Sequence, residues 1–193
     1  MMFAVRIHGR GGQGAVTAAE ILSVAAFNEG RHAQAFPTFG SERTGAPVVS
    51  FCRIDDKPIR LREPITEPDA LIVQDPTLLH QVNLFGGLNP EGYLLVNTSH
   101  RLAELGLEDL VGTLDGRAVA VPATELAREH LGRPLPNAAL LGGFAALTGQ
   151  VSLKAVTGAI RERFAGEVGE GNVRAAEAAY DYVHKVMKEL ADA

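Results

Sequence analysis

The chain has 193 residues, of which 46% are hydrophobic and 21% charged, so we expect one soluble globular domain, residues 1–193, with a single core. Because 18 Lys and Arg residues are outnumbered by 23 Asp and Glu residues, the net charge of -5 argues against a general nucleic-acid binder. No stretch is apolar for long enough to cross a bilayer, and residues 3–7 lack the features of a secretory signal, so we expect a cytoplasmic protein without membrane contact.

The chain begins with the pattern of a strand, a turn, a helix and a second strand. Residues 3–8 are apolar and break at glycines, and residues 15–28 are rich in Ala, Ile, Leu and Glu with helical periodicity. Gly30 suits the C-cap of this helix, and residues 32–36 are short enough to be the returning strand of a right-handed crossover.

A hairpin is predicted next, after a turn-rich loop at residues 38–47. Residues 48–54 alternate and are rich in β-branched side chains, as is typical of a strand. Asp55 and Asp56 indicate a turn into residues 59–62, where apolar and basic residues alternate, so we expect a hairpin at the sheet edge. The basic residues here, interpreted as solvated strand edges, are Arg53, Lys57, Arg60 and Arg62.

Three later apolar runs indicate buried, mostly parallel strands: residues 70–73, 93–96 and 118–121. From Asn137 onward strands disappear, and Asn137 itself suits the N-cap of the first of three helices. These helices are expected at residues 138–147, 153–164 and 172–190. The order of elements predicts a Rossmann-like α/β fold, a mostly parallel sheet with a β-hairpin insertion and C-terminal helices.

Residues 9–14 match the pattern G-x-G-x-x-G between the first strand and the first helix. Glycines allow a tight turn and a close approach of ligand to backbone, and free N–H groups at a helix start favour an anion. The same glycines could serve only to turn the chain sharply and pack the helix on the strand. An NAD site is disfavoured, because the second strand ends at residues 34–37 without the acid that holds the ribose, and Glu29 belongs to the preceding helix.

A second concentrated signal lies at residues 36–47, where two aromatic residues, a Glu and an Arg share one long loop near the glycines. Such a loop can order a substrate or dock a neighbouring subunit, although it could also be a plain turn in which Glu42 pairs with Arg43. Asp75 and Asn97, at strand ends, could line the same crevice as the glycines, but they are interpreted as helix caps. The candidate binding residues of the two segments are Gly9, Arg10, Gly11, Gly12, Gln13, Gly14, Phe39, Glu42 and Arg43.

No reaction centre is visible in this sequence. Cys52, the one cysteine, is expected in the core and cannot supply the four thiolates of an iron–sulfur cluster. The six histidines show no pair at the spacing of a zinc site, and no nucleophile elbow or kinase signature is present. We therefore assign no catalytic residue and no metal to this chain.

Residues 5–14 and 33–48 closely resemble the gamma subunit of pyruvate:ferredoxin oxidoreductases, members of the 2-oxoacid:acceptor oxidoreductase family. The similarity continues at residues 69–73, 137–142 and 169–172, so it covers nearly the whole chain. The resemblance implies a non-autonomous enzyme subunit, in a complex that decarboxylates a 2-oxoacid oxidatively, forms its acyl-CoA and passes electrons to ferredoxin.

The resemblance also implies where the cofactors lie. Thiamine diphosphate and the iron–sulfur clusters belong to partner subunits of alpha, beta and delta type, and this chain carries no cofactor alone. The glycine loop, with Arg10 and Arg43 nearby, is the part we expect to help form a coenzyme A site at a subunit interface.

Three alternatives remain open. The chain could serve a sister enzyme acting on 2-oxoglutarate, 2-ketoisovalerate or indolepyruvate, although Glu42 and Arg43 followed by residues 44–47 favour the pyruvate enzyme. It could be a stand-alone NAD-binding oxidoreductase, which the missing acid disfavours. It could also be a structural subunit whose glycine loop only packs against a partner.

Overall fold

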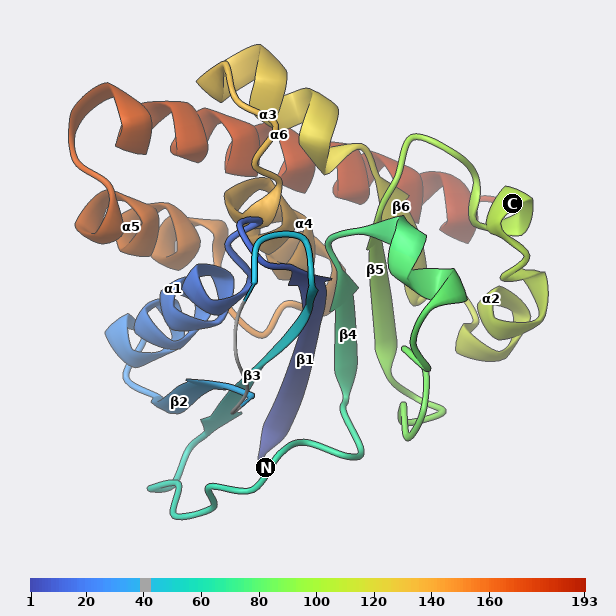
Figure 1. Cartoon of the computed structure of the whole chain (residues 1–193), viewed down its shortest axis with the longest axis horizontal. Helices are drawn as coiled ribbons and strands as arrows, with labels where there is room; N and C mark the ends of the chain where they lie inside the picture. Colours follow the sequence, from blue (N-terminus) through green and yellow to red (C-terminus); the bar gives the residue numbers. More distant parts are fainter. Residues whose placement is uncertain (39–42) are drawn as a thin grey trace.

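The computed structural model describes residues 1–38 and 43–193, which form one mixed sheet with helices on both sides (Figure 1). The strands, in the spatial order β2-β3-β1-β4-β5-β6, are β1 (Phe3–Arg10), β2 (His32–Pro37), β3 (Pro47–Asp55), β4 (Ala70–Val73), β5 (Tyr93–Asn97) and β6 (Ala118–Val121). The helices are α1 (Ala15–Asn28), α2 (Glu108–Leu114), α3 (Ala123–Leu131), α4 (Asn137–Thr148), α5 (Leu153–Arg163) and α6 (Gly166–Ala191), with short 3-10 helices η1 (Pro76–His80) and η2 (Leu102–Leu105).

The predicted parallel strands are confirmed. β1, β4, β5 and β6 run parallel to one another, and all four residues of β4 are buried. One face of the sheet packs against α1 and α4, and the other face of β4 and β5 packs against η1, η2 and α2. Because these strands are covered on both faces, their sequences are continuous apolar runs and not alternating ones.

The first helix and its C-terminal glycine also agree with the prediction. α1 spans Ala15–Asn28, and Gly30 has a φ of +83°, which favours glycine. The amide of Gly30 donates to the carbonyl of Phe27 at 2.9 Å, and the amide of Arg31 donates to the carbonyl of Ala26 at 3.1 Å. This double hydrogen bond is the Schellman motif, which ends the helix and turns the chain into β2.

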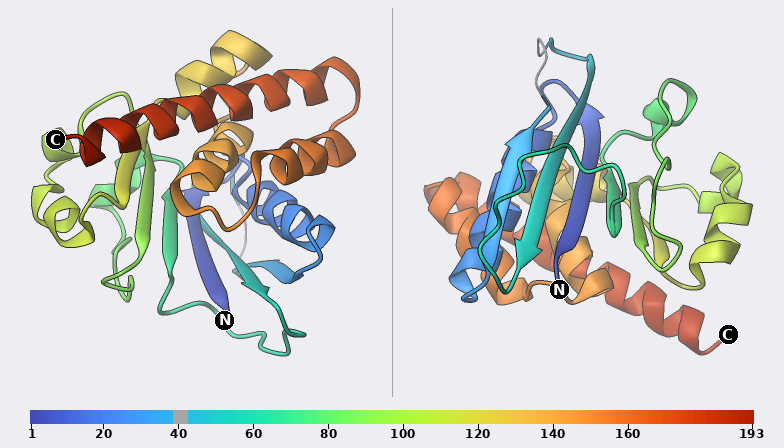
Figure 2. Two further views of the ribbon diagram at one scale, coloured as in Figure 1. Left: turned by 180° about the vertical axis from the view of Figure 1, so that it is seen from behind. Right: turned by 90° about the horizontal axis from the view of Figure 1, so that it is seen from below.

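The hairpin was predicted with the wrong second strand, because residues 59–62 do not pair with β3. β3 is antiparallel to β2 on one side and to β1 on the other, so the hairpin is formed by β2 and β3. Both edges of β3 are therefore occupied, and residues 59–62 form no strand. Residues 56–69 instead pass over the second face of the sheet, shown in teal in Figure 2 (right).

Two buried arginines hold this irregular segment, and neither is a solvated edge residue. Arg53 is only 5% exposed; its guanidinium donates to the backbone carbonyl of Glu63 and lies 5.3 Å from the ring centre of Phe36. Arg6 donates to the carbonyl of Ile65 at 3.2 Å. The arginines replace the strand ladder that the segment lacks, because charged donors satisfy carbonyls that would otherwise be buried without partners.

Arg6 also fixes the neighbouring His8. The Nε atom of Arg6 donates to Nε2 of His8 at 3.0 Å, so that nitrogen carries a lone pair and the ring is neutral. Burial, and then the charge of Arg6, lower the pKa of His8 from 6.5 to about 4. The remaining donors of Arg6 bond the carbonyls of Leu84 and Gly86, both at 2.8 Å.

The three C-terminal helices are present, with one boundary shifted. α6 begins at Gly166 and not at residue 172, because Gly169 and Gly171 lie inside the helix. A Cβ atom on Gly169 would come within 2.2 Å of the carbonyl oxygen of Phe164, so glycine serves here for close packing and does not break the helix. Among the described residues, no helix has the length and apolar character needed to span a membrane.

We predict that Gly142→Ala destabilises the protein. A Cβ atom at Gly142 of α4 would lie 1.9 Å from the carbonyl oxygen of Ala176 in α6, so the two helices would have to separate. The expected loss is about 2–3 kcal/mol in the free energy of unfolding, measured by urea denaturation. Gly158→Ala in α5 is the matched control; its Cβ meets open space, and it should stabilise the helix by about 0.5–1 kcal/mol. Equal effects of both substitutions would contradict this packing.

We further predict that His8 makes the protein sensitive to acid. As the pH falls below 6.5, the unfolded chain takes up a proton on His8 before the folded chain does, so stability is lost between about pH 6.5 and 4. This lowering of the pKa corresponds to about 3 kcal/mol. His8→Gln keeps an acceptor for Arg6 and should flatten the dependence of unfolding free energy on pH over this range. Parallel curves for the variant and the wild type would contradict the prediction.

Candidate functional site

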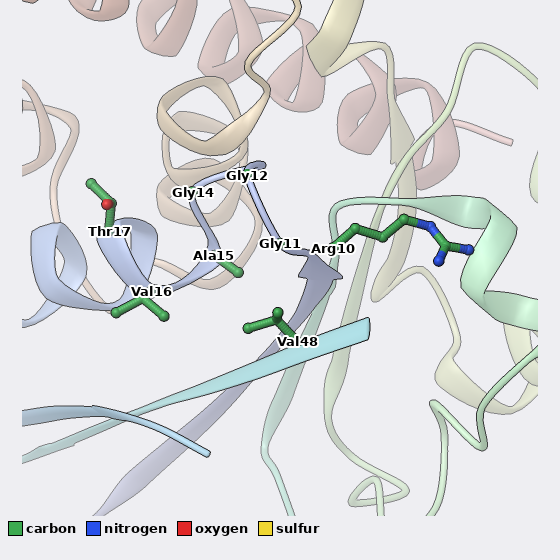
Figure 3. A pocket seen from close by; sticks show the side chains of 8 residues that line it. All are labelled: Arg10, Gly11, Gly12, Gly14, Ala15, Val16, Thr17 and Val48. Atoms are coloured by element: carbon green, nitrogen blue, oxygen red, sulfur yellow. The ribbon is translucent and has the colours of Figure 1, made fainter. Parts of the chain in front are cut away.

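The glycine-rich turn lies at the C-terminal end of β1 and leads into α1 (Figure 3). Gly12 and Gly14 have φ values of +92° and +76°, which other residues rarely adopt. The amides of Ala15, Val16 and Thr17 precede the first possible intrahelical bond, and no side chain caps them within residues 1–38 and 43–193. The first turn of α1 also holds no acidic residue, so this helix start presents positive potential.

A cavity of about 300 Å³ opens at this helix start (Figure 3). It is lined by Arg10, Gly11, Gly12, Gly14, Ala15, Val16, Thr17 and Val48. Four of the predicted binding residues therefore surround one opening, together with three residues of α1 and one of β3 that the sequence analysis did not select.

The structure joins the two predicted segments through Gly11. Its amide donates to the carbonyl of Ala46 at 2.8 Å, and its carbonyl accepts from the amide of Gly45 at 3.0 Å. A Cβ atom on Gly11 would lie 2.1 Å from the carbonyl oxygen of Arg43, so only glycine permits this approach. The predicted residues Phe39 and Glu42 lie outside the described residues, whereas Arg43 is exposed.

Arg10 does not extend into the cavity. Its Nη2 donates to Oγ1 of Thr77 at 2.8 Å, its Nη1 to the carbonyl of Gly45 at 3.0 Å, and its Nε to Oδ2 of Asp75 at 3.2 Å. Figure 3 shows the side chain extending away from the other lining residues. Arg10 thus ties the glycine turn to the start of η1 and to the loop before β3.

Gln13 and Asp75 complete this network. The side-chain carbonyl of Gln13 accepts the amide of Arg10 at 2.8 Å, and its amide donates to Oδ2 of Asp75 at 2.8 Å. Burial alone would raise the pKa of Asp75, but hydrogen bonds from Thr77 and Gln13 and the charge of Arg10 outweigh it, so the pKa is lowered. Asp75 is therefore a carboxylate that braces the turn.

The predicted caps have more than one role. Asp75 does cap η1, accepting from the amide of Thr77 at 2.9 Å, and its contacts with Arg10 and Gln13 come in addition. Asn97 accepts the amide of Thr124 at 3.2 Å and so satisfies the start of α3 from a neighbouring strand. β1, β4 and β5 are parallel neighbours, and their C-terminal ends meet at one edge, where Asp75 contacts Arg10 and Gln13, so capping is only part of its role.

The prediction that Asn137 is an N-cap is wrong. The residue is already helical, Pro136 occupies the cap position, and Nδ2 of Asn137 donates to the carbonyl of Gly14 at 3.4 Å. The same carbonyl accepts the amide of Ala18 at 2.9 Å, so Asn137 ties the start of α4 to the first turn of α1. Cys52 is fully buried, as expected, and burial raises the pKa of its thiol to about 12.

Comparisons with known proteins agree with the fold. The sequence model of the family described as pyruvate ferredoxin/flavodoxin oxidoreductase matches residues 4–182. The chain is 52% identical over 180 residues to the pyruvate/ketoisovalerate oxidoreductases common subunit gamma of Thermococcus kodakarensis, covering 93% of this chain and 96% of that one. It is 49% identical over 184 residues to the pyruvate synthase subunit PorC of Methanocaldococcus jannaschii, covering 95% and 98%.

A crystal structure extends the comparison to the fold. The pyruvate oxidoreductase subunit PORC of Thermotoga maritima superposes with a TM-score of 0.78 at 36% identity, covering 93% of this chain and 96% of that one. The family model thus matches most of the sequence, and the fold agrees with that of the PORC subunit. The chain belongs to the pyruvate ferredoxin/flavodoxin oxidoreductase family.

Proposed function

We propose that this chain is the gamma subunit of a multisubunit pyruvate:ferredoxin oxidoreductase. The complex converts pyruvate and coenzyme A to acetyl-CoA and CO2 and passes electrons to ferredoxin. The observation that carries the proposal is the match of residues 4–182 to the family, with relatives named as gamma or PorC subunits that are covered almost completely. The complex works in the cytoplasm, and its alpha, beta and delta subunits are the partners of this chain.

The chain needs those partners because its own side chains offer no redox centre. Its one cysteine is buried, and burial raises the pKa of the thiol, which disfavours the thiolate that a cluster requires. Thiamine diphosphate and the iron–sulfur clusters therefore belong to the partner subunits, which carry the decarboxylation and the electron transfer.

The part of the reaction assigned to this chain is to hold coenzyme A. The amides at the start of α1, which have no partner among residues 1–38 and 43–193, and the helix dipole favour a phosphate group, in which coenzyme A is rich. The cavity of about 300 Å³ lies at the lower end of ligand pockets, so it fits a phosphate-bearing part of coenzyme A and leaves the rest to a neighbouring subunit. In this role Arg10 and Gln13 keep the turn in shape and do not bind the phosphate.

The arrangement of the strands argues against a stand-alone NAD enzyme. In a dinucleotide fold the second strand lies beside the first and places an acid against the ribose. Here β3 lies between β1 and β2, so the end of β2 is displaced from the glycine turn by two strand spacings, or about 10 Å. The end of β2 also lacks an acid in residues 34–37, so both requirements fail.

A second candidate function has a specific observation in its favour. The relative from Thermococcus kodakarensis is named as a subunit common to pyruvate and ketoisovalerate oxidoreductases. We propose that a 2-ketoisovalerate complex is the next candidate, because the residues around thiamine that select the 2-oxoacid lie on other subunits.

The subunit role predicts the composition and activity of the native complex. Purification through a tag on this chain should yield thiamine- and cluster-bearing subunits and support coenzyme A-dependent viologen reduction. Assays with pyruvate, 2-ketoisovalerate, 2-oxoglutarate and indolepyruvate identify the substrate. A chain that purifies alone and binds NAD would overturn the proposal.

The coenzyme A role predicts a charge effect at Thr17, which lines the cavity. Thr17→Glu places a negative charge at the helix start and should weaken coenzyme A binding to the assembled complex about tenfold, measured by isothermal titration. Thr17→Gln has the same shape without the charge and is the matched control, expected to bind nearly as the wild type. If the Thr17→Glu and Thr17→Gln variants bind coenzyme A equally, the glycine turn is a packing element and the coenzyme lies elsewhere.

A further inference from the structure

One segment of the chain has the sequence of a strand but no strand to pair with. Residues 57–62 are called the strap here, and within it residues 59–62 alternate apolar and basic side chains, a pattern that predicts a β-strand. β3, which directly precedes the strap, has β1 on one side and β2 on the other, so it offers the strap no free edge. Residues 59–62 make no backbone hydrogen bond with any other described part of the chain. Residues 59–62 therefore present backbone donors and acceptors that no other described backbone group uses.

The strap is also held away from the core. Lys57, Arg60, Leu61 and Arg62 are exposed, and Leu61 keeps 48% of its accessible surface. Arg53 binds the carbonyl of Glu63, which fixes the chain just after the strap, while Ile59 is half-buried and the other strap residues stay exposed. A single exposed leucine is ordinary on a protein surface, but Leu61 alternates with exposed cations beside free backbone groups, which suits an added strand.

The strap carries three basic side chains, Lys57, Arg60 and Arg62. Among the described residues, Lys57, Arg60 and Arg62 form no ion pair, although the chain as a whole has a net charge of -5. The carboxylates that precede the strap have partners: Asp55 pairs with the amino terminus at 3.6 Å, and Asp56 pairs with Arg31 at 3.2 Å. The strap is thus a local cationic surface on an acidic protein.

We propose that the strap docks an extended acidic segment of another subunit of the oxidoreductase complex. The segment adds as a strand beside residues 59–62, its backbone bonding theirs, while its Asp and Glu side chains meet Lys57, Arg60 and Arg62. The inference rests on the subunit role proposed above and locates one of its interfaces.

The position of the strap is compatible with a separate coenzyme A site. The strap follows the end of β3, at the end of the sheet where β1 begins (Figure 1). The glycine turn lies at the opposite end of β1, after Arg10. A partner on the strap therefore leaves the cavity at the start of α1 accessible.

The test measures the affinity of this chain for the complex purified without it. Lys57→Glu, Arg60→Glu and Arg62→Glu together should weaken binding on the order of 100-fold, and binding of the wild type should weaken as salt is raised from about 0.05 to 0.5 M. The matched control reverses three exposed cations elsewhere, Arg133→Glu, Lys154→Glu and Lys185→Glu, and should bind nearly as the wild type. Lys57→Gln, Arg60→Gln and Arg62→Gln should give an intermediate loss.

The strand geometry is tested by photo-cross-linking from position 61 in the assembled complex. The expected product joins the strap to an Asp- and Glu-rich extended segment of another subunit, and Leu61→Pro, which removes a backbone donor, should weaken assembly about tenfold. Cross-links only to a second copy of this chain, or binding to phosphatidylserine vesicles with unchanged affinity for the complex, would overturn the proposal.

Failure of the proposed subunit role and failure of the strap proposal give different results. If the wild-type chain does not bind the complex at all, the proposed subunit role fails. If the wild type binds and the strap variant binds equally, or if the control reversal is as damaging as the strap reversal, the subunit role stands and the strap has no part in it. Thermal unfolding of each variant establishes that the fold is retained.

Discussion

The antiparallel placement of β3 between β1 and β2 is the constraint on which the rest of this structure depends. It converts what would be a parallel β1–α1–β2 unit into a mixed sheet and moves β2 to the outer edge. It brings the loop before β3 against the glycine turn, where Gly11 exchanges hydrogen bonds with Gly45 and Ala46. It also leaves residues 56–69 without a strand partner.

Buried arginines replace the hydrogen bonds that a strand partner would have supplied. Arg6 and Arg53 lie on neighbouring strands and reach carbonyl groups of irregular segments, which a sheet or a helix would otherwise satisfy. A guanidinium has five donors in one plane and can serve several carbonyls at once. This explains why the second face of β1 and β3 tolerates an irregular covering while β4 and β5 are covered by helical turns.

Prediction from the sequence succeeded where local pattern and tertiary environment agree. Residues 70–73 and 118–121 match β4 and β6, because a strand buried on both faces must be apolar at each position. It failed at residues 59–62, where alternation is a property of the segment but pairing depends on which edges remain free. The sequence predicted only part of the candidate site. Its pattern identified the glycines, but the contacts of Asp75 with Arg10 and Gln13 depend on the order of the strands, which no local pattern contains.

The contacts of Arg10 have a thermodynamic consequence for whatever binds at the start of α1. Because Asp75, Thr77 and Gly45 already hold its guanidinium, the glycine turn is pre-organised in the free chain. A ligand that enters a pre-organised turn loses less free energy to ordering the protein, so more of its contact energy contributes to affinity. Under the proposed coenzyme A role, Arg10 would therefore act on affinity through the conformational entropy of the backbone and not through contact with the ligand.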